Sequence, residues 1–224
     1  MKVRDLFLGL GCFAAILCCL VGLRVLHNDS QQRAIAHLEY ENSQKEKKLT
    51  TLLVDYEKMI AENNQLNVLL FMADRSKGHV PMYELEEIYD RSYAAAEKYG
   101  LDGAMVLAVF GKESDYIKGA TSNPWEGRYD RGLGQVCPET LEAYNRANNT
   151  NYTEHDLYNI EVAADVSAWY LSNLQQRPYI QDNLGVFTSY NRGPGIYKKD
   201  RKPNEYAYEV AELQLQISNL YASL

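Results

Sequence analysis

Glu113 stands at the end of the most apolar stretch outside the N-terminus and at the start of a long polar one. The run from Ala104 to Phe110 holds no charged residue, whereas Gly, Ser, Asn, Tyr and Arg are frequent at positions 117–136. A carboxyl between these environments would be desolvated on one side, which raises its pKa and keeps it protonated near neutral pH. Such a group can act as a general acid and then as a base. The commoner alternative for a glutamate at a helix end is a solvated side chain.

The residues around Glu113 predict a buried helix that ends at a functional loop. Asp102 is a good N-cap, and residues 104–110 are apolar on nearly every side, as expected of a helix that is buried all round. Helical periodicity then disappears from 117 to 136. Long irregular segments in a compact domain tend to carry function, so we expect the helix to hold Glu113 at the edge of this loop.

Helical patterns account for most of the remaining chain from residue 80 onward. No alternating pattern is strong enough for a sheet, although a short hairpin within 117–136 stays open. We therefore expect a mainly α domain. Its further predicted helices cover 83–99 with Gly100 as a C-terminal stop, 138–147, 159–176, 180–190 and 204–223.

Four motifs follow one another in this domain. Glu113-Ser114 comes first, and Ala120-Thr121-Ser122 follows it. Next is the segment from Gly132 to Thr140, Gly-Leu-Gly-Gln-Val-Cys-Pro-Glu-Thr, and last the turn Tyr-Asn-Arg-Gly-Pro-Gly that begins at Tyr190. In this order they resemble the catalytic Glu-Ser pair, the Ala-x-Ser element, the Gly-Leu-Met-Gln-x-x-Pro-x-Thr segment and the Tyr-Asn-x-Gly-Pro-Gly turn of the soluble lytic transglycosylases, relatives of the goose-type lysozymes. The resemblance covers roughly residues 85 to 215.

This resemblance implies a lysozyme-like helical domain that cleaves peptidoglycan glycan strands, for wall remodelling or local wall opening, without a cofactor. Glu113 would protonate the oxygen between N-acetylmuramic acid and N-acetylglucosamine. It would then take the proton from the muramic acid C6 hydroxyl, which closes onto C1 to give a 1,6-anhydro end. One carboxylate suffices for this reaction, in contrast to the two of ordinary glycosidases.

The resemblance also implies four residues that contact the glycan or the catalytic carboxyl. Ser122 would hydrogen-bond near Glu113 or the sugar, and Gln135 would contact the glycan. The Tyr190 hydroxyl would point toward Glu113, and Asn191 would hold the turn or the substrate's acetamido group. Each residue also has an interpretation that involves no binding. Ser122 would cap the loop and Gln135 would be a surface amide, whereas Tyr190 would be a core aromatic residue and Asn191 a turn residue.

Two departures from the family pattern leave the sugar site incompletely defined. Gly134 stands where the family usually has methionine, which removes an apolar wall. The segment 123–131 is longer than typical and contains Trp125, which would either stack on a sugar face or pack locally as a plug.

Two other activities therefore stay open. A muramidase that admits water would use Glu126, Asp130 or Asp115 as a second carboxylate. A non-catalytic glycan-binding assembly protein would use the cleft only to hold wall polymer, and the presence of Glu113 together with Tyr190 argues against it.

Charge and cysteine usage disfavour several classes of site. The net charge is -7, and from residue 80 onward 13 basic and 21 acidic residues give 13 − 21 = -8, which disfavours nucleic-acid binding. Three of the four cysteines lie in the N-terminal apolar run, so Cys137 has no partner for a disulfide or a thiolate metal site in the rest of the chain. The histidines are scattered, and we expect no metal.

The N-terminus carries a segment typical of a signal anchor or a signal peptide. Residues 6–23 are uncharged, and at about 1.5 Å per residue they nearly span a hydrocarbon core of about 30 Å. Ala34-Ile35-Ala36 has the form of a cleavage site but lies far beyond the apolar run, so we expect the anchor, residues 1–28, to be retained. We expect a single-pass protein of the cell membrane with its catalytic domain outside the cytoplasm.

Residues 29–79 predict a helical stalk before a domain at 80–224, with a boundary at Gly78 to Pro81. A stripe of residues spaced by three and four runs along it: Leu49, Leu52, Tyr56, Met59, Asn63, Leu66 and Leu70. One interpretation is a homodimeric coiled coil in which Asn63 sets the register. The other is one amphipathic helix packed on the catalytic domain.

Overall fold

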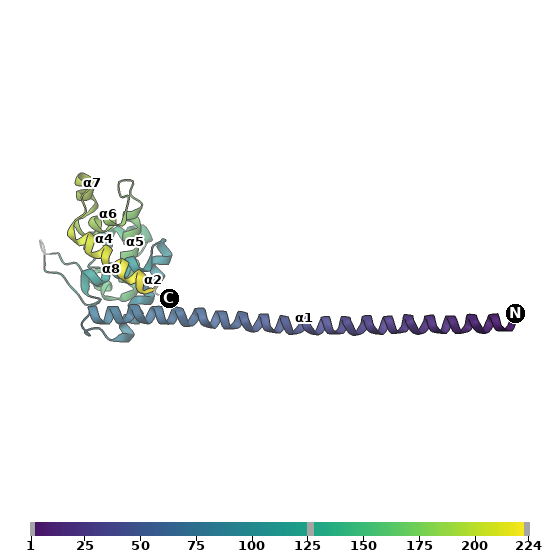
Figure 1. The fold of residues 1–224 in the computed structure, drawn as a ribbon. Coiled ribbons are helices and arrows are strands. Elements are labelled where there is room, and N and C mark those ends of the chain that lie inside the picture. The colour runs from purple at the N-terminus through teal and green to yellow at the C-terminus, as the bar shows by residue number, and fades with distance from the viewer. Residues whose placement is uncertain (1–2, 125–127, 222–224) are drawn as a thin grey trace. The chain divides into compact units, whose positions relative to one another are not determined.

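The computed structural model describes residues 3–124 and 128–221, with side chains from residue 19 onward except at 22 and 26. The described residues confirm the mainly α prediction (Figure 1). The elements are α1 (Val3–Arg75), α2 (Met82–Tyr99), α3 (Gly103–Ser114), α4 (Pro138–Asn148), the 3-10 helix η1 (Glu154–Tyr158), α5 (Ile160–Gln175), α6 (Asn183–Arg192), α7 (Pro194–Asp200) and α8 (Glu205–Tyr221).

The chain divides into two compact units, Met1–Met59 and Ile60–Leu224. The end of α1 therefore belongs to the helical domain, although the sequence places residues up to 79 in a stalk. Val68 and Met72 are fully buried in the core of this second unit. The Gly78 to Pro81 break interrupts the helix without separating it from the domain, because apolar side chains on both sides of the break share one core.

The face of α1 that packs on the domain is not the predicted stripe. Asn64, Val68 and Met72 are buried, and the Asn64 side chain donates to the Tyr221 carbonyl at 2.6 Å. All seven residues of the stripe are exposed: Leu49, Leu52, Tyr56, Met59, Asn63, Leu66 and Leu70. Residues 60–75 therefore pack on the domain, but through a face other than the predicted stripe. The coiled coil stays a prediction.

Among the described residues no helix is both long and apolar enough to cross a membrane. Most of the predicted anchor at 6–23 falls on positions whose side chains lie outside the described residues. The anchor therefore stays a prediction.

Helix α3 is enclosed on several sides, as its apolar composition predicts. Asp102 caps its start, since the Ala104 amide donates to Asp102 Oδ1 at 2.9 Å. Gly100 ends α2 with a left-handed φ of 69°, which an L side chain adopts only at a cost. Residues 103–111 are all buried, and α3 packs against α2, α5 and α8. This packing makes α3 a rigid support for the carboxyl at its end.

The connection between α3 and α4 is irregular, as predicted. Its described residues form isolated antiparallel bridges, Thr121 to Arg131 and Arg131 to Val136, and no named strand, so the hairpin is reduced to single bridges. The short helices η1 and α7 have no counterpart in the sequence prediction because each spans too few residues to show periodicity.

The domain boundary can be tested with one buried and one exposed residue of α1. Met72→Ala should lower the free energy of unfolding of the helical domain by about 2–5 kcal/mol, because it leaves a cavity in the core. Leu70→Ala is the control, since Leu70 lies on the exposed face of the same helix. Urea unfolding followed by circular dichroism measures both. Equal, small effects would mean that residues 60–75 are not part of the domain.

Candidate active site

Glu113 lies in the last turn of α3, where the chain turns sharply. Asp115 and Tyr116 both adopt left-handed backbone conformations, with φ of 49° and 63°. The Ser114 hydroxyl lies within hydrogen-bond distance of the Phe110 carbonyl (3.0 Å) and the Leu133 carbonyl (2.9 Å). The end of α3 is thereby attached to the loop before α4, and Glu113 is held between the two.

A side chain from α1 also holds this helix end. Arg75 Nε donates to the Gly111 carbonyl at 2.7 Å and lies 3.3 Å from Asp115 Oδ1. Gly111 permits this approach, because a Cβ there would lie 2.8 Å from the Tyr116 hydroxyl and 3.1 Å from Arg75 Nε. Arg75 therefore connects the last regular turn of α3 to the strained residues that follow Glu113.

The Glu113 carboxyl has the electrostatic properties of a general acid. Burial raises its pKa from 4.5 to about 7, and the negative charge of Asp130 adds to the rise. The Tyr206 hydroxyl, from the first turn of α8, donates to Glu113 Oε1 at 2.5 Å and acts in the opposite direction, as does the Lys112 ammonium. With a pKa near 7, the carboxyl exists in both protonation states at neutral pH, as an acid that later serves as a base requires.

The resemblance implies that the Tyr190 hydroxyl points toward Glu113, but the tyrosine that donates to this carboxyl is Tyr206. The Tyr190 hydroxyl donates instead to the Gly134 carbonyl at 2.7 Å. It stays close enough to the site for the Glu113 charge, after burial, to raise its pKa well above 10. Tyr206 is not among the residues predicted from the sequence, although the sequence holds a signal for it: Tyr206 lies on the same helical face as the buried Val210 and Leu213, where a hydroxyl must find a partner.

Neighbouring side chains surround Gly134, where the family usually has methionine. A Cβ at this position would lie 2.2 Å from Ser167 Oγ and 2.8 Å from the Tyr190 hydroxyl. The missing methionine therefore leaves no gap, because Tyr190 and Ser167 occupy that side of the site.

The four predicted substrate-binding residues line two adjoining cavities. A cavity of about 180 Å³ is lined by Gln135, Tyr190 and Asn191 among others. A second of about 430 Å³ is lined by Ser122, and the two share Asp130 and Cys137. The structure thus brings together residues that are far apart in the sequence, from the loop before α4 and from the end of α6.

Three of these side chains already have local partners. Gln135 Nε2 donates to the Gly132 carbonyl (2.9 Å), and Ser122 Oγ accepts from the Asp130 amide (2.9 Å). Asn191 Oδ1 accepts from Asn204 Nδ2 at 2.8 Å. The Ser122 contact is the one expected of a loop cap. Contact with a glycan stays a prediction for all four positions.

Of the two proposed second carboxylates that the structure describes, Asp130 lines these cavities and Asp115 does not. Burial, with a smaller contribution from Glu139, raises the pKa of Asp130 above the usual value. Asp115 is exposed and pairs with Arg75. Glu126, like Trp125, lies outside the described residues. Within residues 3–124 and 128–221, no three His, Cys, Asp or Glu side chains group so that they could hold a metal ion.

Comparison with known proteins assigns the family. A solved structure, an inactive mutant of the lytic transglycosylase Slt from Pseudomonas aeruginosa, is similar at 22% identity with a TM-score of 0.46. That similarity covers 59% of this chain and 23% of the other. No curated protein matches the chain. The profile of the Transglycosylase SLT domain family, however, matches residues 91–212, more than half of the sequence, and the chain therefore belongs to that family.

Proposed function

We propose that the protein is a peptidoglycan lytic transglycosylase that cleaves the bond between N-acetylmuramic acid and N-acetylglucosamine, with Glu113 as acid and base. The observation that carries this proposal is the buried Glu113 carboxyl, with a pKa raised to about 7 and a hydrogen bond from Tyr206. Membership of the transglycosylase family supports the substrate class.

In the first step the protonated Glu113 gives its proton to the glycosidic oxygen, and the bond from that oxygen to muramic acid C1 breaks. The electron pair leaves with the oxygen, and positive charge develops at C1 and the ring oxygen. The Glu113 carboxylate that remains stabilises this charge, and the Tyr206 hydroxyl, as donor, stabilises the carboxylate.

In the second step the carboxylate takes the proton of the muramic acid C6 hydroxyl, and O6 attacks C1. The product is a 1,6-anhydro end, no water is consumed, and Glu113 returns to its protonated form. A single group serves both steps because its pKa lies near the pH at which it works.

A hydrolytic muramidase is the second candidate, and one observation favours it. Asp130 lines the cavity that Tyr190 and Asn191 also line, and its charge acts on Glu113. A carboxylate in that place could orient a water molecule toward C1 in place of the C6 hydroxyl.

Product analysis separates the two chemistries. Glu113→Gln should lower the cleavage of purified sacculi by roughly 10²- to 10⁴-fold, since the amide keeps the shape but cannot donate the proton. Mass spectrometry of wild-type digests should show muropeptides lighter by one water, with ends that resist borohydride. Asp130→Asn serves as the comparison and should have a mild effect. Reducible ends, together with a strong loss in Asp130→Asn, would establish the muramidase instead.

The hydrogen bond from Tyr206 to Glu113 predicts how the pH dependence of kcat/KM changes when the hydroxyl is removed. Catalysis needs protonated Glu113, so kcat/KM should fall as pH rises through about 7. Tyr206→Phe removes a donor that favours the carboxylate, so the pKa of Glu113 should rise and this alkaline limb should move up by about one pH unit. Tyr208→Phe, exposed on the same helix, is the control. An unchanged limb, or one shifted to lower pH, would contradict the role of Tyr206.

For the N-terminus we propose a retained single-pass anchor at residues 6–23, which places the catalytic domain outside the cytoplasm. We also propose that the stalk pairs with a second copy of the chain through the stripe from Leu49 to Leu70. The apolar composition of 6–23 supports the anchor. The exposure of the stripe, which is apolar except for Asn63, supports the pairing.

Fractionation tests this arrangement. The full-length chain should remain in the membrane pellet after an alkaline wash, and a reporter fused after Leu224 should be active only outside the cytoplasm. Light scattering in detergent should give the mass of a dimer, which Leu52→Lys should reduce to that of a monomer. A soluble species that begins near His37 would show that the Ala34-Ile35-Ala36 site is cut.

A further inference from the structure

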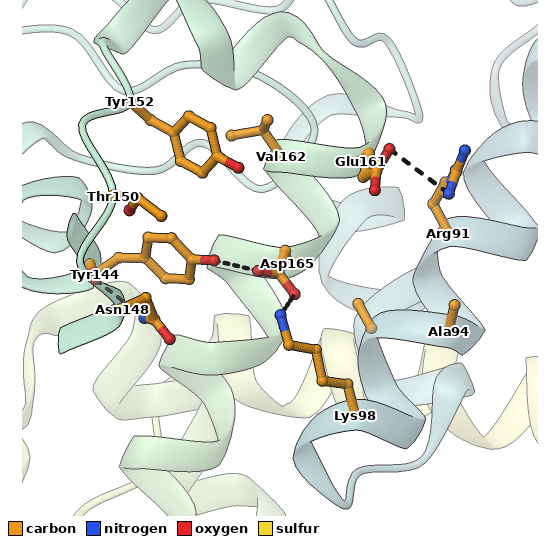
Figure 2. Close-up of a pocket in the computed structure, with 11 residues that line it drawn as sticks. Arg91, Ala94, Lys98, Tyr144, Asn148, Thr150, Tyr152, Glu161, Val162 and Asp165 are labelled. Carbon is orange, nitrogen blue, oxygen red and sulfur yellow. Dashed lines mark hydrogen bonds and ion pairs between the residues drawn. The ribbon is translucent and has the colours of Figure 1, made fainter.

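A second concave site lies in the helical domain between α2, α4 and α5 (Figure 2). Its volume is about 430 Å³, within the range of small-ligand sites, about 300–1,000 Å³. Ala95 and Val162 give it an apolar part, and charged side chains surround this part. It shares no lining residue with the two cavities of the candidate active site.

The two sites lie on opposite faces of α5. Asp165 lines the second site, whereas Ser167 packs beside Gly134 and Tyr190 in the candidate active site. Residues that are two positions apart in an α-helix, such as Asp165 and Ser167, are separated by about 200° around the helix axis. A ligand in the second site would therefore not compete with a glycan at Glu113.

One half of the second site is preorganised. Lys98 Nζ lies 2.7 Å from Asp165 Oδ1, the Tyr144 hydroxyl donates to Asp165, and the Tyr99 hydroxyl lies 3.3 Å from the same carboxylate. Figure 2 shows the Lys98 and Tyr144 contacts converging on Asp165. With three donors around it, this carboxylate is fixed without a ligand.

The other half is held loosely. Arg91 NH1 lies 3.6 Å from Glu161 Oε2, beyond hydrogen-bond distance, and the two side chains are 46% and 66% exposed. An exposed ion pair of this kind contributes little to stability. Both members can exchange their partner for a ligand at small cost.

The charges select the kind of ligand. Two cations, Arg91 and Lys98, and two anions, Glu161 and Asp165, line the cavity as two ion pairs, so a purely anionic or purely cationic ligand would meet repulsion as well as attraction. A neutral sugar would make no charge-charge contact with these four side chains. Of the two aromatic residues that line the cavity, Tyr144 is 2% exposed and lies against Trp169, and Tyr152, 36% exposed, stacks with Tyr144 at 6.2 Å between ring centroids.

We propose that this cavity binds a short peptide segment that carries both a carboxylate and an ammonium group, the carboxylate at Arg91 and the ammonium at Glu161. The peptide stems of peptidoglycan have this chemistry, and their choice as the source rests on the proposed function. Bound here, a stem would hold the glycan strand to the domain at a second point and raise its local concentration at Glu113.

The test measures the binding of soluble stem peptides, released from purified sacculi by an amidase, to the full chain in detergent by calorimetry. Arg91→Gln and Glu161→Gln should each weaken binding about tenfold, the expected loss for one charge-assisted contact. Arg146→Gln, from an exposed ion pair on α4 outside the cavity, is the matched control and should bind like wild type. Blocking the peptide's ammonium by acetylation should reproduce the Glu161→Gln effect.

Binding that is absent in the wild type, or equal in wild type and Arg91→Gln, would overturn the proposal. Thermal unfolding of each variant shows whether weaker binding reflects unfolding, and acetylation tests the same contact with an unaltered protein. Cleavage of peptide-free glycan strands separates the two proposals. Anhydro products without stem binding would support the proposed function and contradict the second binding site. Stem binding without cleavage would support the second binding site and contradict the proposed function.

Discussion

Burial of the Glu113 carboxyl disfavours its ionised form. The neighbouring helices supply the side chains that offset part of this free-energy cost. Because the folded-state pKa is raised from 4.5 to about 7, the free energy of unfolding falls as pH rises between these values, by about 3 kcal/mol in total. The Tyr206 hydroxyl offsets part of this cost and requires the first turn of α8 to lie over the end of α3. The Lys112 to Glu209 ion pair joins the same two helices nearby. The packing of α8 on α3 is thus tied to the chemistry at Glu113.

The structural domain is larger than the segment that the family profile matches. The profile begins at residue 91, whereas the compact unit begins at Ile60. Within the additional segment, Met72 fills the core and Arg75 holds the carbonyl of Gly111, two residues before Glu113. Residues outside the segment that the profile matches therefore contribute to the geometry of the helix end that carries Glu113.

The sequence predicts what local patterns determine and misses what long-range packing decides. Asp102, Gly100 and the apolar run before Glu113 set α3 and its burial, because caps and periodicity act within a few residues. The partner of the Glu113 carboxyl could not be found in this way, since Tyr206 is 93 residues away and 18 tyrosines in the chain compete for the assignment. The boundary predicted at Gly78 to Pro81 differs from the observed start of the compact unit at Ile60 for a similar reason, because a local helix break does not show whether the helix before it packs into the same core. Periodicity identifies an apolar face but not the surface against which a helix packs.

Gly134 and Tyr190 lie 56 positions apart in the chain but share one volume. Any side chain larger than hydrogen at 134 would enter the space of the Tyr190 hydroxyl and of Ser167. A larger residue introduced here would fit only if both neighbours moved, so a substitution at 134 would need compensating changes at 167 and 190. The glycine therefore leaves room for an aromatic hydroxyl and a serine to form this wall of the site together.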